Sequence, residues 1–263
     1  MMQGDGELRL AAAAAVAREA GTLALRYFRN LESLVVESKG PQDIVSAADR
    51  AVEDLVRLRL GALFPDDAIL GEEGGLEGEG REGTWIVDPI DGTWCFLNGI
   101  GAWCVALAYV RDNRIEIGVI YDPNAGELFA ARLGGGATLD GRPIKVAPVT
   151  SVTQGTVSVG HSARVPPSAA VATIDRLLQA GGMFHRHGSG ALGLAWTACG
   201  RLIGYVEAHM NSWDAAAGLL LIAEAGGYTN DYLANDGMLK GNFVLGCPPA
   251  LRQALCEAAG VEV

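Results

Sequence analysis

The sequence predicts a layered α+β protein whose second half has α/β character. Two segments with helical periodicity come first, a run of strands joined by short turns follows, and from about Ala147 strands and helices alternate. This order of elements is typical of helices packed on an antiparallel sheet, joined to an α/β layer. We therefore expect one compact unit with a division between residues 1–146 and 147–263.

The first elements are predicted to be helices. Residues 7–31 carry apolar side chains at helical spacing, which predicts a long amphipathic helix. Leu34 to Glu37 is expected to be a short strand, and the composition of residues 39–43 predicts a loop. Ser46 is the expected N-cap of a second helix that runs through Phe64.

Strands dominate the next part. Residues 68–70 and 85–87 are short apolar segments, separated by a glycine-rich acidic stretch, residues 74–83, that predicts an exposed loop. The pairs Asp112-Asn113 and Asp140-Gly141 are turn signals between further strands. These strands are expected at residues 102–110, 114–121, 127–132 and 137–139.

The second half alternates. The pattern predicts strands at residues 156–159, 202–207 and 242–245 and helices at residues 168–180, 190–199, 215–225 and 249–259.

Composition limits the classes of function. The 263 residues are 49% apolar and 19% charged, which is typical of a globular protein. The net charge of −11, from 20 basic and 31 acidic residues, argues against nucleic acid or an anionic membrane as the main partner. An acidic protein still binds a phosphate ester where cations supply local positive charge.

The five cysteines argue against a zinc site and a disulfide framework, because their number is odd and no two have a CxxC spacing. The sequence contains no GxSxG motif, which argues against a serine hydrolase. The N-terminal segment lacks the features of a signal peptide, and no apolar stretch approaches the length of a membrane span. We therefore expect a cytoplasmic protein.

The segment Trp85–Thr93 carries the strongest functional signal. An apolar strand leads into Asp88 and Asp91, which are separated by Pro89 and Ile90. Such a pair is commonly a solvated turn or a helix cap. Two carboxylates beside a helix start are also suited to hold divalent cations next to a phosphate.

Other acidic residues have two interpretations each. Glu72-Glu73 is a solvated loop pair or a source of one ligand, because adjacent side chains point in different directions. Asp214 is an N-cap of an alanine-rich helix or a distant ligand that closes the site. Asp49 either complements a helix dipole or faces the site. Thr93 either caps a helix or faces the site.

Taken together, these residues resemble the inositol monophosphatase family of Mg²⁺-dependent, lithium-sensitive phosphatases. The resemblance runs from about residue 7 to the end and rests on short motifs in a fixed order: GEE at 71–73, DPIDGT at 88–93, GSGAL at 188–192, WDAAAG at 213–218 and EAGG at 224–227.

The resemblance implies an αβαβα sandwich, often dimeric, with two or three Mg²⁺ ions in each site. It implies that the ligands are Glu72, Asp88, the Ile90 carbonyl, Asp91 and Asp214. Thr93 and Asp49 are implied to orient and help deprotonate the attacking water, which Glu72 also holds. The implied substrate contacts are Gly92, Thr93, Ser189 and Glu207. Trp94 and Lys39 are candidates for the mouth of the site, where Lys39 is either a solvated loop lysine or a phosphate contact.

Three positions depart from the family pattern. After the DGT motif and Trp94, Cys95 stands where the family usually has asparagine, the usual proline a few residues later is replaced around Gly101, and Gly193 replaces a usual aspartate. Since these positions are expected near the substrate or a subunit contact, they leave the substrate open. Trp94 is suited either to stack on a planar group or to pack in the interior.

The resulting hypothesis is Mg²⁺-dependent hydrolysis of a small phosphate monoester, inositol monophosphate or a similar polyol or sugar phosphate, by a homodimer. The alternative substrates are histidinol phosphate, 3′-phosphoadenosine 5′-phosphate and fructose 1,6-bisphosphate. A non-enzymatic alternative is a regulatory binding protein that retains the fold.

Overall fold

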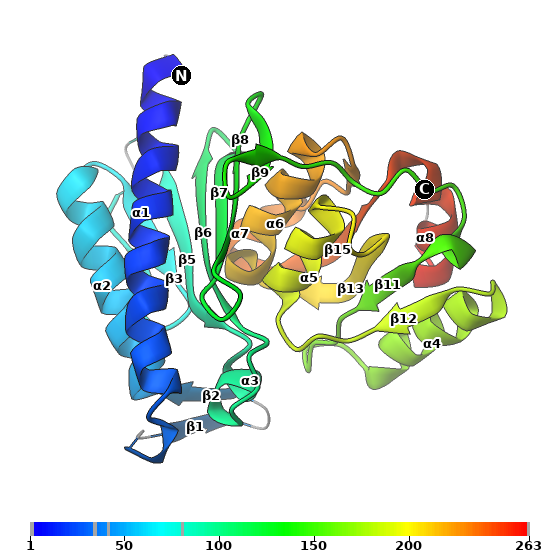
Figure 1. The fold of residues 1–263 in the computed structure, drawn as a ribbon, viewed down its shortest axis with the longest axis horizontal. Helices are drawn as coiled ribbons and strands as arrows, with labels where there is room; N and C mark the ends of the chain where they lie inside the picture. The colour runs from blue at the N-terminus through cyan, green and yellow to red at the C-terminus, as the bar shows by residue number, and fades with distance from the viewer. Residues whose placement is uncertain (1–2, 34–35, 41–42, 80–81, 262–263) are drawn as a thin grey trace.

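The computed structural model describes residues 3–33, 36–40, 43–79 and 82–261. Over these residues the elements stack in five layers, helix–sheet–helix–sheet–helix (Figure 1). The predicted αβαβα sandwich is therefore confirmed.

The first layer is formed by α1 (Gln3–Phe28) and α2 (Ala47–Leu63), which pack on one face of the larger sheet. The predicted N-cap of the second helix is confirmed, because the Ser46 hydroxyl accepts hydrogen bonds from the backbone N–H groups of Ala48 and Asp49 at 3.1 and 3.4 Å. The first helix begins before the predicted segment and ends earlier, and a short 3₁₀ turn, η1 (Leu31–Ser33), follows it.

The larger sheet has the strand order β10-β9-β8-β7-β6-β5-β3-β4 among the described residues. Only β3 and β5 pair in parallel there. Both predicted turns are confirmed, and their residues have positive φ angles, 50° and 55° at Asp112 and Asn113 and 49° and 76° at Asp140 and Gly141. The strands are β3 (Ala68–Gly71), β4 (Gly75–Glu77), β5 (Thr84–Asp91), β6 (Cys104–Arg111), β7 (Arg114–Asp122), β8 (Glu127–Arg132), β9 (Gly136–Leu139) and β10 (Arg142–Pro143).

Two segments predicted as loops contain strands. Within residues 74–83, β4 pairs antiparallel with β3 and covers what would otherwise be an open sheet edge. Around residues 39–43, β1 (Val36–Gly40) pairs with β2 (Asp43–Ser46), because β-branched residues flank the polar ones. The expected strand at 34–37 overlaps β1, and its first two residues lie outside the described part of the chain.

The second sheet has the order β12-β11-β13-β15-β14 and is mixed. Its strands β12, β11 and β13 are parallel, whereas β15 runs antiparallel to β13 and to β14. The short strands β12 and β14 were not predicted, because two or three residues give no periodic signal. The strands are β11 (Thr156–Val159), β12 (Met183–His185), β13 (Gly204–Met210), β14 (Tyr228–Thr229) and β15 (Asn242–Cys247).

Helices α5 and α6 lie between the two sheets, and α4 and α8 cover the outer face of the second sheet (Figure 1). The predicted helices are therefore present with shifted ends. The remaining elements are α3 (Thr93–Leu97), α4 (Pro167–Gln179), α5 (Gly190–Ala198), α6 (Ser212–Glu224), α7 (Gly237–Lys240), α8 (Arg252–Ala259) and the 3₁₀ turns η2 (Val152–Gln154), η3 (Ala234–Asp236) and η4 (Pro249–Leu251).

Within the described part of the chain, three apolar clusters fill the spaces between the layers. The middle cluster joins residues of both halves, such as Phe129 of β8 and Leu194 of α5. The division at residue 147 stays a prediction, but the halves share a core.

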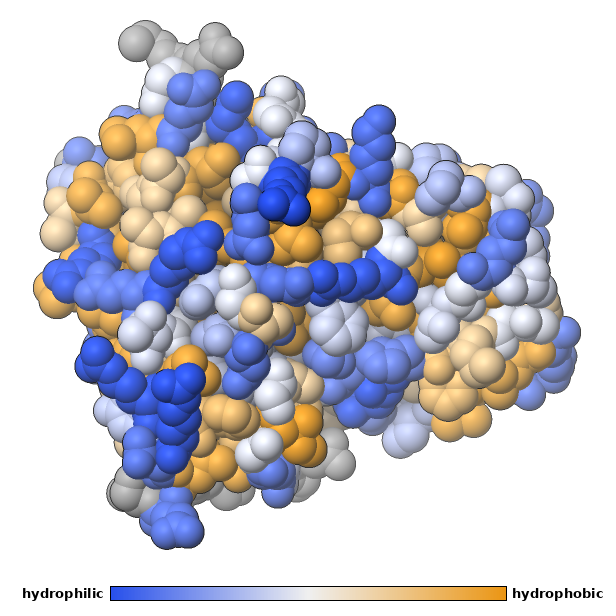
Figure 2. Space-filling model, viewed as in Figure 1, coloured by the Kyte–Doolittle hydropathy of each residue, from blue (hydrophilic) through white to orange (hydrophobic). Residues whose placement is uncertain are grey.

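On the face shown in Figure 2, hydrophilic residues are interspersed with apolar patches, as on an ordinary globular surface. Among the described helices, none has the length and apolar content needed to span a bilayer.

Candidate active site and metal centre

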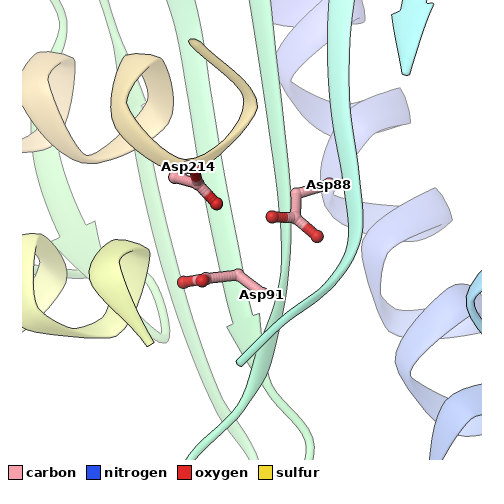
Figure 3. Close-up of side chains that lie close together, drawn as sticks. All are labelled: Asp88, Asp91 and Asp214. Carbon is pink, nitrogen blue, oxygen red and sulfur yellow. The ribbon is translucent and has the colours of Figure 1, made fainter. Parts of the chain in front are cut away.

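Three aspartates from distant parts of the chain converge between the two sheets. Asp88 and Asp91 lie on β5, and Asp214 lies in the first turn of α6. One carboxylate oxygen from each lies within 4.8 Å of the others, and Figure 3 shows the three carboxyl groups facing a common space. The interpretation of Asp214 as an N-cap is wrong, because Asn211 has the extended backbone of the cap. The structure thus brings together the motifs at residues 88–93 and 213–218.

A β-bulge explains why Asp88 and Asp91 face the same way. Residues three apart on a regular strand point to opposite faces of the sheet. Here Asp88 pairs with Ala106 and Asp91 pairs with Cys104, so β5 has one more residue than β6 over this interval. The extra residue reverses the alternation, and Pro89, which has no N–H for the ladder, suits that position.

The site is electrostatically unfavourable without a cation. Burial raises the pKa of Asp88, Asp91 and Asp214, in the last case to about 8, and the neighbouring carboxylates reinforce the shift at Asp88 and Asp214. One Asp88 oxygen, Oδ1, accepts from the Ile90 backbone N–H at 2.9 Å, whereas Oδ2 is buried without a hydrogen-bond donor. An all-oxygen group with an unpaired buried acceptor fits a hard cation such as Mg²⁺.

Glu72 lies beside this group on the turn between β3 and β4, where its backbone N–H donates to the Val87 carbonyl at 3.2 Å. Burial raises the pKa of its carboxyl well above the usual value, and the charges of Asp214 and Asp49 contribute to the shift. Its carboxylate stands outside the 4.8 Å group.

Thr93 and Asp49 form a second pair at the edge of the site. The Thr93 hydroxyl lies 3.4 Å from Asp49 Oδ1 and 3.1 Å from the Ile90 carbonyl oxygen, and it can donate to either acceptor. Asp49 Oδ2 accepts from the Ser46 backbone N–H and hydroxyl at 2.8 and 2.5 Å. Asp49 therefore completes a capping box and also faces Thr93, so both of its interpretations are present in one residue. Gly92 precedes Thr93 with φ of 99°, which a side chain would strain.

The groups that hold the Asp91 carboxylate in place were not predicted. Its carboxylate accepts from the Ser189 hydroxyl at 2.5 Å and from the backbone N–H groups of Ala191 and Gly190 at 2.7 and 3.3 Å. The Ser189 hydroxyl also caps α5 by accepting from the Leu192 N–H. Ser189, expected at the substrate, thus contacts a metal-ligand candidate directly. A serine before a helix predicts a cap but does not identify a partner 98 residues away.

Glu53 is another residue that the sequence analysis missed. Its buried carboxylate on α2 accepts from the backbone N–H groups of Glu73 and Gly74 at 2.8 and 2.7 Å and from Arg57 Nε at 2.8 Å. It therefore fixes the turn that carries Glu72. Its position four residues after Asp49, on the same face of the helix, was the available signal.

A cavity of about 130 Å³ adjoins Asp91 and Asp214. Its lining includes Ser189 and Glu207, two of the expected substrate contacts. Trp94 is half exposed on α3 and is not part of that lining, so its expected packing in the interior is wrong. Lys39 lies on β1, and its side chain is outside the described part of the structure.

A buried carboxylate cluster at the centre of an αβαβα sandwich defines a class of proteins suited to hold a hard cation beside a small-molecule cavity. The chain matches the model of the inositol monophosphatase family over residues 6–260. It is 41% identical over 222 residues to a Nus factor SuhB of Xylella fastidiosa, which covers 84% of this chain and 80% of that relative. It is 38% identical over 245 residues to an inositol-1-monophosphatase of Mesorhizobium japonicum, with 92% of each chain covered.

Solved structures of proteins named suhB and IMPase have the same fold as this chain. The extragenic suppressor protein suhB of Bartonella henselae superposes with a TM-score of 0.90 at 31% identity, covering 97% of this chain and 100% of that one. The IMPase of Thermotoga maritima gives a TM-score of 0.84 at 28% identity, with 96% of each chain covered. The chain therefore belongs to the inositol monophosphatase family, and this membership supports phosphatase activity and metal binding.

Proposed function

We propose that this protein hydrolyses a small phosphate monoester, inositol monophosphate or a similar polyol or sugar phosphate, in a Mg²⁺-dependent reaction. The observation that carries the proposal is the cluster of Asp88, Asp91 and Asp214, whose buried Asp88 Oδ2 has no donor, next to a cavity lined by Glu207.

Each residue has a defined task in this proposal. Asp88, Asp91 and Asp214 would hold Mg²⁺, together with Glu72 and the Ile90 carbonyl, and two or three ions are expected. When bound, Mg²⁺ supplies positive charge that neutralises the phosphoryl oxygens and lowers the pKa of a nearby water. The Thr93 hydroxyl can donate to Asp49 Oδ1, which leaves its oxygen free to accept a hydrogen from the attacking water. Gly92 and Thr93 offer backbone N–H groups to the phosphate.

A phosphate-release panel tests the substrate. Inositol 1-phosphate, histidinol phosphate, 3′-phosphoadenosine 5′-phosphate and fructose 1,6-bisphosphate are compared by kcat/KM in millimolar Mg²⁺. We expect the highest value for inositol 1-phosphate, abolition by EDTA and inhibition by Li⁺. Release of phosphate from none of the four compounds would contradict the proposed function, and full activity in EDTA would contradict the metal requirement.

The stability of the protein is expected to respond to Mg²⁺ and pH together. The pKa values of Asp88, Asp91 and Asp214 are raised on folding, so the metal-free protein loses stability as pH rises through these folded values, toward about 8 for Asp214. Mg²⁺ binds the ionised carboxylates, so it should raise Tm more at pH 8 than at pH 5.5.

Differential scanning calorimetry at both pH values measures this effect, with NaCl of equal ionic strength as the control for screening. An equal rise in Tm at both pH values, or the same rise with NaCl, would argue against a cation site at the three aspartates.

A second, regulatory role is kept as an alternative because the relative from Xylella fastidiosa is named a Nus factor. We further propose a homodimer in the cytoplasm, with a small phosphate ester as its partner and neither nucleic acid nor membrane bound directly. Light scattering of the purified protein tests the dimer, and a catalytically inactive variant that retains a cellular phenotype would favour the regulatory role.

A further inference from the structure

Tyr205 is a buried phenol that the proposed catalysis does not use. It lies on β13, two residues before Glu207, so the two side chains share one face of the strand. Its side chain is buried, and its hydroxyl donates to Glu207 Oε2 at 2.6 Å. Both residues line the cavity beside Asp91 and Asp214.

We propose that Tyr205 is a specificity-determining positioning residue, whose hydroxyl fixes the Glu207 carboxylate to receive the hydroxyl groups of a neutral polyol leaving group. The inference rests on the proposed function, since it concerns the leaving-group side of the same cavity.

Three glycines make room for this phenol. A Cβ atom at Gly193 would lie 2.7 Å from Tyr205 Cε2, and one at Gly190 would lie 3.1 Å from the Tyr205 hydroxyl oxygen. One at Gly160 would overlap Glu207 Oε2 and lie 2.6 Å from the same hydroxyl. Gly193 stands inside α5, where glycine is a poorer helix former than alanine. The ring therefore occupies the space that Gly193, one of the departures from the family pattern, leaves open.

The hydrogen bond leaves Glu207 oriented and half satisfied. Among the described residues, Tyr205 is the donor to this carboxylate, so Oε1 is left to accept from a ligand. Burial raises the pKa of Glu207 to about 7, and the Tyr205 hydroxyl opposes that shift by stabilising the ionised form. An oriented carboxylate oxygen accepts hydrogen bonds from hydroxyl groups and discriminates against substrates that lack them.

Arg186 also lines the cavity, and its positive charge opposes the rise in the pKa of Glu207. The guanidinium therefore favours the ionised carboxylate, which is the form that accepts hydrogen bonds from hydroxyl groups.

Tyr205→Phe tests the inference, because it removes the hydroxyl and keeps the ring. We measure kcat/KM for inositol 1-phosphate and for p-nitrophenyl phosphate, whose leaving group has no vicinal hydroxyls. The ratio of the two values should fall about tenfold in the variant, mainly through a higher KM for inositol 1-phosphate, because the variant loses a hydrogen bond to a charged group.

Tyr109→Phe is the matched control. Tyr109 is also a buried phenol that faces a carboxylate, Asp67, with 3.3 Å between the oxygens, but it packs between the first sheet and its outer helices. The ratio should not change in this variant. If Tyr205→Phe fails to fold, Gly193→Ala displaces the ring while keeping its hydroxyl and should lower the same ratio.

The outcomes separate the two proposals. An unchanged ratio in a folded Tyr205→Phe protein, or an equal fall in Tyr109→Phe, overturns the role of Tyr205 and leaves the phosphatase proposal standing. A wild-type protein that releases phosphate from neither compound overturns the proposed function and this inference with it.

Discussion

Asp91→Asn should lower kcat by roughly 1000-fold or more, which corresponds to about 4 kcal/mol of lost transition-state stabilisation. The substitution keeps the size of the side chain but removes one of the three charges that face the common space in Figure 3. The Ser189 hydroxyl and the Ala191 N–H both donate to Oδ2, so the amide oxygen of asparagine can accept these two hydrogen bonds while its N–H₂ takes the place of Oδ1.

The fold should survive this change. In the metal-free protein the variant removes a buried like charge beside Asp88 and Asp214, so its Tm at pH 8 should be no lower than that of the wild type. The rise in Tm caused by Mg²⁺ should shrink. Steady-state kinetics at saturating Mg²⁺ and thermal melts with and without Mg²⁺ measure both effects.

Asp122→Asn is the matched control. Asp122 is a buried aspartate at the end of β7, and its carboxylate accepts hydrogen bonds from the backbone N–H groups of Asn124 and Ala125. The Asp122→Asn variant should have a lower Tm than the wild type and the same kcat. If Asp91→Asn kept kcat within about tenfold of the wild type, Asp91 would not be a metal ligand.

Local signals in the sequence predicted local structure well. The Ser46 cap and the hairpin turns at Asp112 and Asp140 depend on residues within a few positions of one another, and all three are confirmed. The convergence of Asp88, Asp91 and Asp214 was predicted from the family resemblance, which rests on the order of the motifs. The periodicity of apolar residues did not predict it.

What the sequence could not supply depends on contacts between distant segments. The bulge that turns Asp91 toward Asp88 exists only in the pairing of β5 with β6, which no local pattern of residues reveals. The bonds from Ser189 to Asp91 and from Glu53 to the Glu72 turn join residues 98 and 20 positions apart. Propensity carries no information about such partners.

Small residues allow α6 to pack closely on the larger sheet, as it does at Gly118. This glycine lies on β7 under α6, where a Cβ atom would be 2.6 Å from the Ala217 carbonyl oxygen and 3.0 Å from its Cα. These are backbone atoms of the helix, so no rotamer change can relieve the contact. An added methyl must move the helix.

Gly118→Ala should therefore weaken the fold and the metal site together. Overpacking of this kind costs about 1–3 kcal/mol, and α6 carries Asp214 only three residues before Ala217. We expect a lower Tm in the absence of metal and a higher Mg²⁺ concentration at half-maximal activity, measured by thermal melts and by Mg²⁺ titration of phosphatase activity. Gly61→Ala on α2 is the control, because its Cβ meets nothing within 4 Å and the helix should gain stability. If Gly118→Ala matched the wild type in both measurements, the helix would not be held against the sheet by this contact, and the position of Asp214 would have to be set by other contacts of α6, such as those with α5.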